Sequence, residues 1–257
     1  MKRVLTALLL FPIGIYVVLW SPPWAFAAVV AVVACLSYYE FDGLAKAYGF
    51  GAPGPIGYAA GLLLLFVEQA PWPWLTIVLT ALIAIALAMR AADLAQSLPR
   101  VSLLAMGLVY IFGAWKCAFL LREKGAHWLM YALIVNWAGD IGAYYVGRAF
   151  GRHKLALRVS PKKTWEGAAG SVAASVLVAG AYLLRFAAPI GWPEVLALTI
   201  MVNIAGQVGD LAESAMKRGA GVKDSGTILP GHGGFLDRVD STLFALPVVY
   251  AWLALFR

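Results

Sequence analysis

The chain has 257 residues, of which 62% are hydrophobic and only 13% are charged, and its mean hydropathy is +0.81. Soluble domains are usually nearer half apolar and a quarter charged, so this composition excludes an ordinary soluble protein and predicts a chain surrounded largely by lipid. The formal net charge is +7, but the basic residues lie in short connections between apolar runs, which argues against nucleic acid as a partner.

Apolar runs of about 20 residues, the length of a membrane-spanning helix, follow one another along the whole chain. The first run follows two basic residues and resembles a signal peptide, but the many later runs favour a retained span. We therefore predict an all-α, polytopic integral membrane protein with about nine transmembrane helices and a single membrane domain over residues 1–257. The predicted spans are Val4–Trp20, Trp24–Tyr39, Pro55–Ala70, Trp72–Met89, Val101–Leu121, Trp128–Gly147, Gly167–Ala188, Val195–Ala215 and Thr242–Phe256.

Lys and Arg residues are unevenly divided between the two sides of these spans. With nine spans, fifteen of the 20 share the side of the N-terminus and four lie on the other side, while Lys116 falls within a span. Because cytoplasmic connections carry an excess of Lys and Arg, we expect a cell (inner) membrane protein with its N-terminus inside and its C-terminus outside. The two long polar connections, residues 148–166 and 216–241, then both face the cytoplasm. The long side chain of Lys116 is expected to reach toward the membrane surface.

Acidic residues inside or at the ends of spans are costly and therefore point to function. Asp140 lies well inside the sixth predicted span, and Asp210 and Glu213 lie near the cytoplasmic end of the eighth. Asp237 and Asp240 precede the ninth, and once a helix has begun their spacing places them on one face. Adjacent carboxylates repel unless a cation joins them, and Mg²⁺ prefers such oxygen ligands. Helix capping explains Asp237 or Asp240 alone, but not an acid near a helix C-terminus such as Asp210, so we favour a metal site.

Basic residues and glycines surround these acids in both polar connections. The excess of cytoplasmic Lys and Arg explains their number, but not their interleaving with Gly, Ser, Thr and acids. Glycines 231, 233 and 234 permit positive φ and a close approach of backbone N–H groups to an anion, and a helix starting after them would direct its amides at a phosphate. His232 lies within this turn. It could contact phosphate or transfer a proton, and the alternative is a purely structural turn residue. These residues predict a membrane enzyme with a cytoplasm-facing, metal-dependent phosphate site.

The stretch SAMKRGAGVKDSGTILPGHGGFLDRVD, from Ser214 to Asp240, resembles the signature of the phosphatidate cytidylyltransferases, also called CDP-diacylglycerol synthases. We call it the signature segment. The upstream stretches GDIGAYYVGRAFGRHKL and SPKKTWEG also resemble motifs of that family. The resemblance therefore covers the C-terminal half, whereas the N-terminal half is similar only in being several apolar spans. It implies a division into N-terminal spans over residues 1–125 and a catalytic half over residues 126–257.

The resemblance implies that CTP and phosphatidate react to give CDP-diacylglycerol and pyrophosphate in phospholipid biosynthesis. It places a Mg²⁺ site on Asp210, Asp237 and Asp240, with a second cation such as K⁺, and it implies a homodimer. Lys223 and Asp224 join these three residues as candidate catalytic residues. Candidate residues for binding CTP or the lipid headgroup are Ser160, Lys162, Lys163, Thr164, Glu166, Ser214, Lys217, Arg218, His232, Gly233, Gly234 and Arg238.

Two other functions stay open at this point. A cytidylyltransferase or kinase acting on an isoprenoid lipid would need the same phosphate chemistry, because the preference for headgroup and tail is not legible in the sequence. A transporter could instead use Asp140 and Asp210 as ion-coupling residues in two related halves. Its support is a Gly-Asp pair that recurs near the ends of two spans, in each case eight residues before an Arg.

Overall fold

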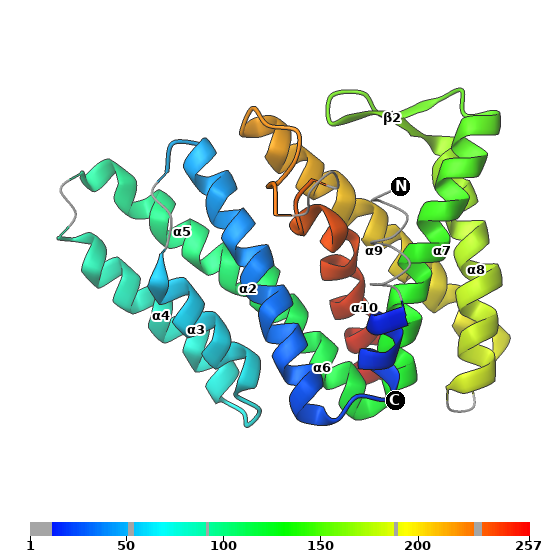
Figure 1. Cartoon of the computed structure of the whole chain (residues 1–257), viewed down its shortest axis with the longest axis horizontal. Coiled ribbons are helices and arrows are strands. Elements are labelled where there is room, and N and C mark those ends of the chain that lie inside the picture. Colours follow the sequence, from blue (N-terminus) through cyan, green and yellow to red (C-terminus); the bar gives the residue numbers. More distant parts are fainter. Residues whose placement is uncertain (1–11, 51–53, 91–92, 188–189, 229–232) are drawn as a thin grey trace. The chain divides into compact units, whose positions relative to one another are not determined.

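The computed structural model describes residues 12–50, 54–90, 93–187, 190–228 and 233–257 (Figure 1). These residues are mostly helical, which confirms the predicted all-α class, and one short two-stranded sheet accompanies the helices. Residues 12–19 form a helix near the N-terminus. The elements that follow are α2 (Pro23–Ala47), α3 (Pro55–Phe66), α4 (Trp72–Ala88), η1 (Leu94–Gln96), α5 (Ser97–Gly107), η2 (Leu108–Gly113), α6 (Ala114–Lys124), α7 (Ala126–Phe150), β1 (Lys154–Ala156), β2 (Ser160–Thr164), α8 (Trp165–Phe186), α9 (Trp192–Gly219), η3 (Leu236–Arg238) and α10 (Asp240–Phe256).

Four helical stretches in the described part of the chain are long and apolar enough to cross a membrane: Pro23–Ala47, Leu94–Lys124, Trp165–Phe186 and Trp192–Gly219. Three shorter apolar helices, α3, α4 and α10, accompany them. Helix α7 is as long as α2 but carries several polar residues, which line a cavity described below. The chain is thus a polytopic membrane protein, and the count of nine spans stays a prediction.

The chain divides into two compact units, and each is described by itself. The first comprises Met1–Pro22, Cys117–Ala215 and Val239–Arg257, and the second comprises Pro23–Lys116 and Met216–Arg238. The assignment of the whole chain to one membrane domain stays a prediction.

Helices α7 and α8 pack closely along their length in the first unit (Figure 1). A Cβ atom added to Gly142 of α7 would lie 2.5 Å from the carbonyl oxygen of Gly170 and 2.5 Å from the Cβ atom of Ala174, both on α8. A Cβ atom on Gly170 would likewise lie 2.5 Å from the Cβ atom of Val146. Small residues on both helices therefore allow the two backbones to approach, a common arrangement among transmembrane helices.

The core of the second unit is built around Tyr38 of α2, whose side chain is fully buried. Its ring lies 5.2 Å from the ring of Phe112 and 4.8 Å from that of Tyr58, measured between centroids. Gly57 and Gly107 make room for this ring, since a Cβ atom on either would lie within 2.5 Å of it. Aromatic packing thus joins α2, α3 and the α5–η2 helix.

Helix α2 is longer than the predicted span, which stopped at Tyr39. It continues to Ala47 and includes Glu40 and Asp42, which are 2% and 5% exposed. The prediction ended the span at the first charged residue. A buried carboxylate is compatible with a continuing helix when other groups donate hydrogen bonds to it, as they do to Glu40.

Lys116 is buried within the protein, so its ammonium group does not reach water as expected from the sequence. Its ammonium group donates hydrogen bonds to the carbonyl oxygens of Leu65 and Val67, at 3.0 and 2.8 Å. These carbonyls lie at the C-terminal end of α3, where helical carbonyl groups lack partners within the helix and a positive charge is favourable. Lys116 reaches them from a helix that is π-helical over Leu108–Gly113.

Candidate functional site

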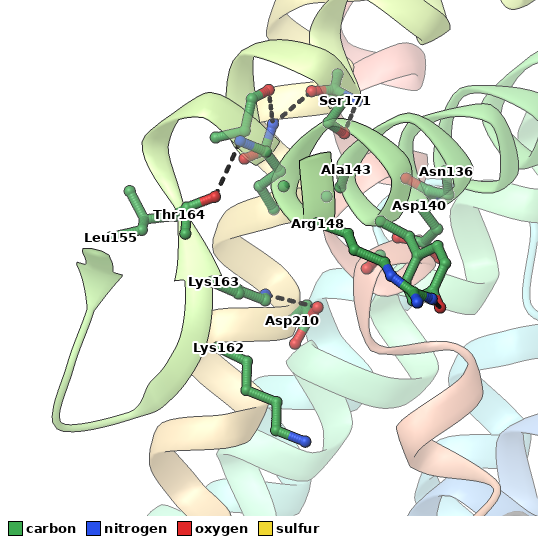
Figure 2. A pocket seen from close by; sticks show the side chains of 18 residues that line it. Asn136, Asp140, Ala143, Arg148, Leu155, Lys162, Lys163, Thr164, Ser171 and Asp210 are labelled. Atoms are coloured by element: carbon green, nitrogen blue, oxygen red, sulfur yellow. Dashed lines mark hydrogen bonds and ion pairs between the residues drawn. The ribbon is translucent and has the colours of Figure 1, made fainter. Parts of the chain in front are cut away.

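A cavity of about 350 Å³ with several charged residues in its lining opens in the first unit (Figure 2). Residues from α7, the β-hairpin, α8, α9 and the first turn of α10 line it. The charged ones are Asp140, Arg148, Lys162, Lys163 and Asp210. Three cations and two carboxylates around one cavity are suited to a phosphate-bearing ligand.

The β-hairpin supplies Lys162 and Lys163 to this cavity. Strands β1 and β2 pair antiparallel, with Lys154 opposite Thr164. The Glu166 carboxylate accepts hydrogen bonds from the backbone N–H groups of Arg152 (3.1 Å) and His153 (3.2 Å), which closes the base of the hairpin. Glu166, which was predicted to bind CTP or the lipid headgroup, therefore holds the hairpin that carries the two lysines.

Thr164 begins α8 as its N-cap, because its hydroxyl oxygen accepts the N–H of Gly167 at 3.1 Å. This contact fixes the direction in which the chain leaves the hairpin. Thr164 also lines the cavity, so this predicted ligand residue lies beside the lysines, whereas Ser160 lies at the far end of β2.

Lys163 pairs with Asp210 across the cavity, with 2.6 Å between Nζ and Oδ2, and Figure 2 marks this contact. The hydroxyl of Ser214 donates to the other carboxylate oxygen of Asp210 at 3.4 Å. Glu213 is fully buried instead, so it does not share the position of Asp210 at the cavity. The structure thus brings together five of the predicted site residues: Lys162, Lys163, Thr164 and Asp210 at the cavity, and Ser214 bonded to Asp210.

Asp140 and Arg148 line the same cavity from α7. Neither was among the residues predicted to bind substrate or metal, and Asp140 was considered only as an ion-coupling residue of a transporter. A ladder of uncharged polar groups on α8 and α9 lines part of the same cavity. The Asn203 amide donates to the hydroxyl oxygens of Ser171 and Ser175, both at 2.9 Å, and accepts from the Gln207 amide at 2.6 Å. The spacing of four residues on both α8 and α9 is the signal that could have indicated facing polar stripes.

A second group of predicted site residues gathers in the second unit, within the signature segment. Lys217 forms an ion pair with Oδ1 of Asp237, and both side chains are only 10% exposed. Oδ2 of Asp237 accepts the backbone N–H groups of Gly234 (2.7 Å) and Ser225 (3.1 Å). Burial alone would raise the pKa of Asp237, but the hydrogen bond and charge of Lys217 and these two N–H donors together hold it below its ordinary value.

Glycine lets the turn before Asp237 fold tightly. Gly233 has a φ of 78°, in the region that favours glycine, as predicted. A Cβ atom at Gly233 would lie 3.0 Å from Oδ2 of Asp237 and 3.4 Å from Oδ1 of Asp224. The backbone donor of Gly234, expected to face an anion, points at the carboxylate of Asp237 itself.

The remaining predicted site residues lie at the surface or at a helix start. Arg218, Lys223, Asp224 and Arg238 are exposed, and Arg218 donates to the carbonyl oxygen of Val222 at 3.1 Å. Asp237 lies in η3, whereas Asp240 is the first residue of α10, so the two do not share one helix. His232 lies outside the described residues.

No group of three or more His, Cys, Asp or Glu side chains in the described ranges is arranged to hold a metal ion. Asp210 and Asp240 belong to the first unit and Asp237 to the second. The set of three metal ligands therefore stays a prediction.

Comparison with known proteins gives one consistent answer. The phosphatidate cytidylyltransferase of Bacillus subtilis (strain 168) is 33% identical over 268 residues, which cover 99% of this chain and 98% of the relative. The enzymes of the same name from Staphylococcus aureus (strain COL) and Staphylococcus saprophyticus are 37% and 36% identical over 202 and 209 residues, and the match covers 77% of this chain and of each relative. Residues 1–256 match the Cytidylyltransferase family as a whole, including the N-terminal half that carries no motif. The chain therefore belongs to the Cytidylyltransferase family.

Proposed function

We propose that this membrane protein is a phosphatidate cytidylyltransferase, which makes CDP-diacylglycerol from CTP and phosphatidate. The observation that carries the proposal is the similarity over almost the full chain to an enzyme of that name. The cationic cavity and the intact signature segment are consistent with it, because both substrates carry phosphate groups.

The reaction joins two anions. A phosphate oxygen of phosphatidate attacks the α-phosphorus of CTP, the bond between that phosphorus and the bridging oxygen breaks, and pyrophosphate leaves with the bond's electrons. The nucleophile is already ionised, so the protein needs no strong general base. Its task is to hold the two phosphate groups together and to stabilise the departing charge. Lys162, Lys163 and Arg148, which line the cavity, supply positive charge for that task.

A divalent cation fits the donor chemistry of the predicted ligands. Asp210 and Asp237 each present carboxylate oxygens, and each is paired with a lysine, so a positive charge beside either carboxylate is favourable. We propose that Asp210, Asp237 and Asp240 hold Mg²⁺, which would neutralise charge on the phosphates when bound. A second cation, a homodimer and a cytoplasmic active site in the cell membrane are further parts of the proposal.

The test is turnover by the purified protein in detergent, measured as CDP-diacylglycerol and pyrophosphate formed from CTP. Phosphatidate should support the reaction and an isoprenyl phosphate should not. Chelation of divalent ions should abolish turnover, and added Mg²⁺ should restore it. A protein that turns over CTP only with the isoprenyl phosphate would contradict the assignment, and full turnover in chelator would remove Mg²⁺ from it.

A matched pair of variants tests the site itself. Asp237→Asn should lose nearly all turnover while the protein still inserts into membranes. Asp93→Asn changes an acid that only begins a short 3₁₀ turn, so it should keep the turnover of the wild type. Equal turnover in both variants would exclude Asp237 from the site.

A further inference from the structure

Glu40 is a buried acid that none of the motifs includes, yet the signature segment folds against it. It lies on α2 and is 2% exposed. Its Oε2 atom accepts two hydrogen bonds of 2.7 Å, one from the hydroxyl of Ser225 and one from the backbone N–H of Leu236. Both donors come from the signature segment, 185 and 196 residues along the chain. One carboxylate of the N-terminal half thus contacts two points of this segment within a single unit.

The Ser225 hydroxyl extends this contact to Asp237. It donates to Glu40 and accepts the backbone N–H of Asp237 at 3.3 Å. The backbone N–H of Ser225 in turn donates to the Asp237 carboxylate at 3.1 Å. Asp237 is therefore held between Lys217 on one side and backbone that Glu40 fixes on the other.

Two glycines show how closely the segment fits this carboxylate. A Cβ atom on Gly226 would lie 2.3 Å from Oε1 of Glu40, and one on Gly234 would lie 2.4 Å from Oε2. Side chains at either position would displace the carboxylate or the backbone. A buried carboxylate is costly, and the two short hydrogen bonds to Oε2 offset part of this cost.

We propose that Glu40 is a positioning residue for cytidylyl transfer. It touches no substrate, and it acts by fixing Ser225 and Leu236 so that the Asp237 carboxylate keeps its place. The kinetic part of this inference rests on the proposed function, whereas the anchoring of the signature segment does not. Loss of the anchor should lower kcat more than it changes KM, because a misplacement of about 1 Å costs on the order of 100-fold in rate.

The kinetic experiment compares Glu40→Ala and Ser225→Ala with Asp42→Asn. Asp42 is the matched control, since it is a second buried acid of the same helix and makes no hydrogen bond or ion pair with the described residues of the signature segment. We expect kcat to fall about 10- to 100-fold in the first two variants, with KM for CTP within about threefold of the wild type. Asp42→Asn should keep kcat within about twofold. Glu40→Gln keeps an acceptor oxygen at this position and should recover part of the loss in Glu40→Ala.

A measurement without turnover separates the two proposals. Lys223 lies exposed in the signature segment, so trypsin cleavage after it reports whether the segment is anchored. Cleavage should be faster in Glu40→Ala and Ser225→Ala than in the wild type and in Asp42→Asn. If the wild type does not turn over CTP, the proposed function fails and the cleavage rates alone decide on the anchor.

Three results would overturn the role of Glu40. These are a kcat within twofold of the wild type in Glu40→Ala, unchanged cleavage, or an equal loss of kcat in Asp42→Asn. If Glu40→Ala does not accumulate in membranes, Glu40→Gln and Ser225→Ala decide by the same two measurements.

Discussion

Lys217→Met removes the counter-charge of a carboxylate that is only 10% exposed. Two backbone N–H groups still donate to Asp237, but the ion pair and its hydrogen bond are lost. Removing one partner of a buried pair costs about 3–5 kcal/mol. Because those N–H donors remain, we expect a cost at the lower end of this range, a loss of about 3 kcal/mol in the free energy of unfolding at pH 7.

The pH dependence of this loss has a definite sign. In the wild type the pKa of Asp237 lies below its ordinary value of about 3.9, so its stabilising contribution is complete above that value and is lost as the pH falls through the lowered pKa. In Lys217→Met, burial raises the pKa of Asp237 and only the two N–H donors oppose it. We therefore expect the pKa of Asp237 to be higher in the folded variant than in the unfolded one. Protonation then favours the folded variant, so its deficit should shrink between pH 7 and pH 5.

Unfolding in detergent micelles, followed by tryptophan fluorescence at both pH values, measures these quantities. The control is the double variant Lys217→Met/Asp237→Asn, which removes both charges and should regain at least half of the lost stability. A loss below about 1 kcal/mol in the single variant, or a double variant no more stable than the single one, would contradict a stabilising buried pair of Lys217 and Asp237.

Three further substitutions test the first unit. Lys163→Ala should raise KM for CTP or phosphatidate about tenfold with little change in the melting temperature, whereas Lys154→Ala on the same hairpin should change neither; equal KM values would exclude Lys163 from substrate binding. Gly142→Val should destabilise the α7–α8 contact by roughly 2 kcal/mol or more. The control Gly43→Ala has open space around it and should be neutral or stabilising. Equal melting temperatures of the two variants would contradict the close packing at Gly142. Glu166→Gln should accelerate trypsin cleavage within the hairpin, and unchanged cleavage would mean that the Glu166 carboxylate does not hold its base.

The positions of the helices were largely predictable, because a span is a long apolar run and its ends are marked by Pro, Gly and charge. The predicted starts of the spans at Pro55 and Trp72 coincide with the first residues of α3 and α4. The extension of α2 was missed because a sequence shows the charge of Glu40 but not the donors that meet it from almost 200 residues away. Its role in the candidate site was missed for the same reason.

The chemistry of the site was predictable in kind but not in arrangement. The charges of Lys163 and Asp210 were expected to serve a phosphate site, yet only the hairpin explains why they meet. The two strands of that hairpin have three and five residues, which is too short for an alternating pattern of apolar and polar residues to be recognised. The ladder of serine, asparagine and glutamine was not predicted, because single uncharged polar residues are common in membrane helices and only the packing of α8 on α9 shows that these bond to one another.

The π-helical turn at Leu108–Gly113 has a consequence for how this chain can change in length. Successive residues of an α-helix are rotated by about 100° around its axis, so one residue deleted from this turn would rotate everything after it by a similar angle. Lys116, three residues beyond the turn, would then point away from the carbonyls at the end of α3. We expect related chains to vary in residue type across this helix and to keep its number of residues, so that gaps in their alignment fall elsewhere.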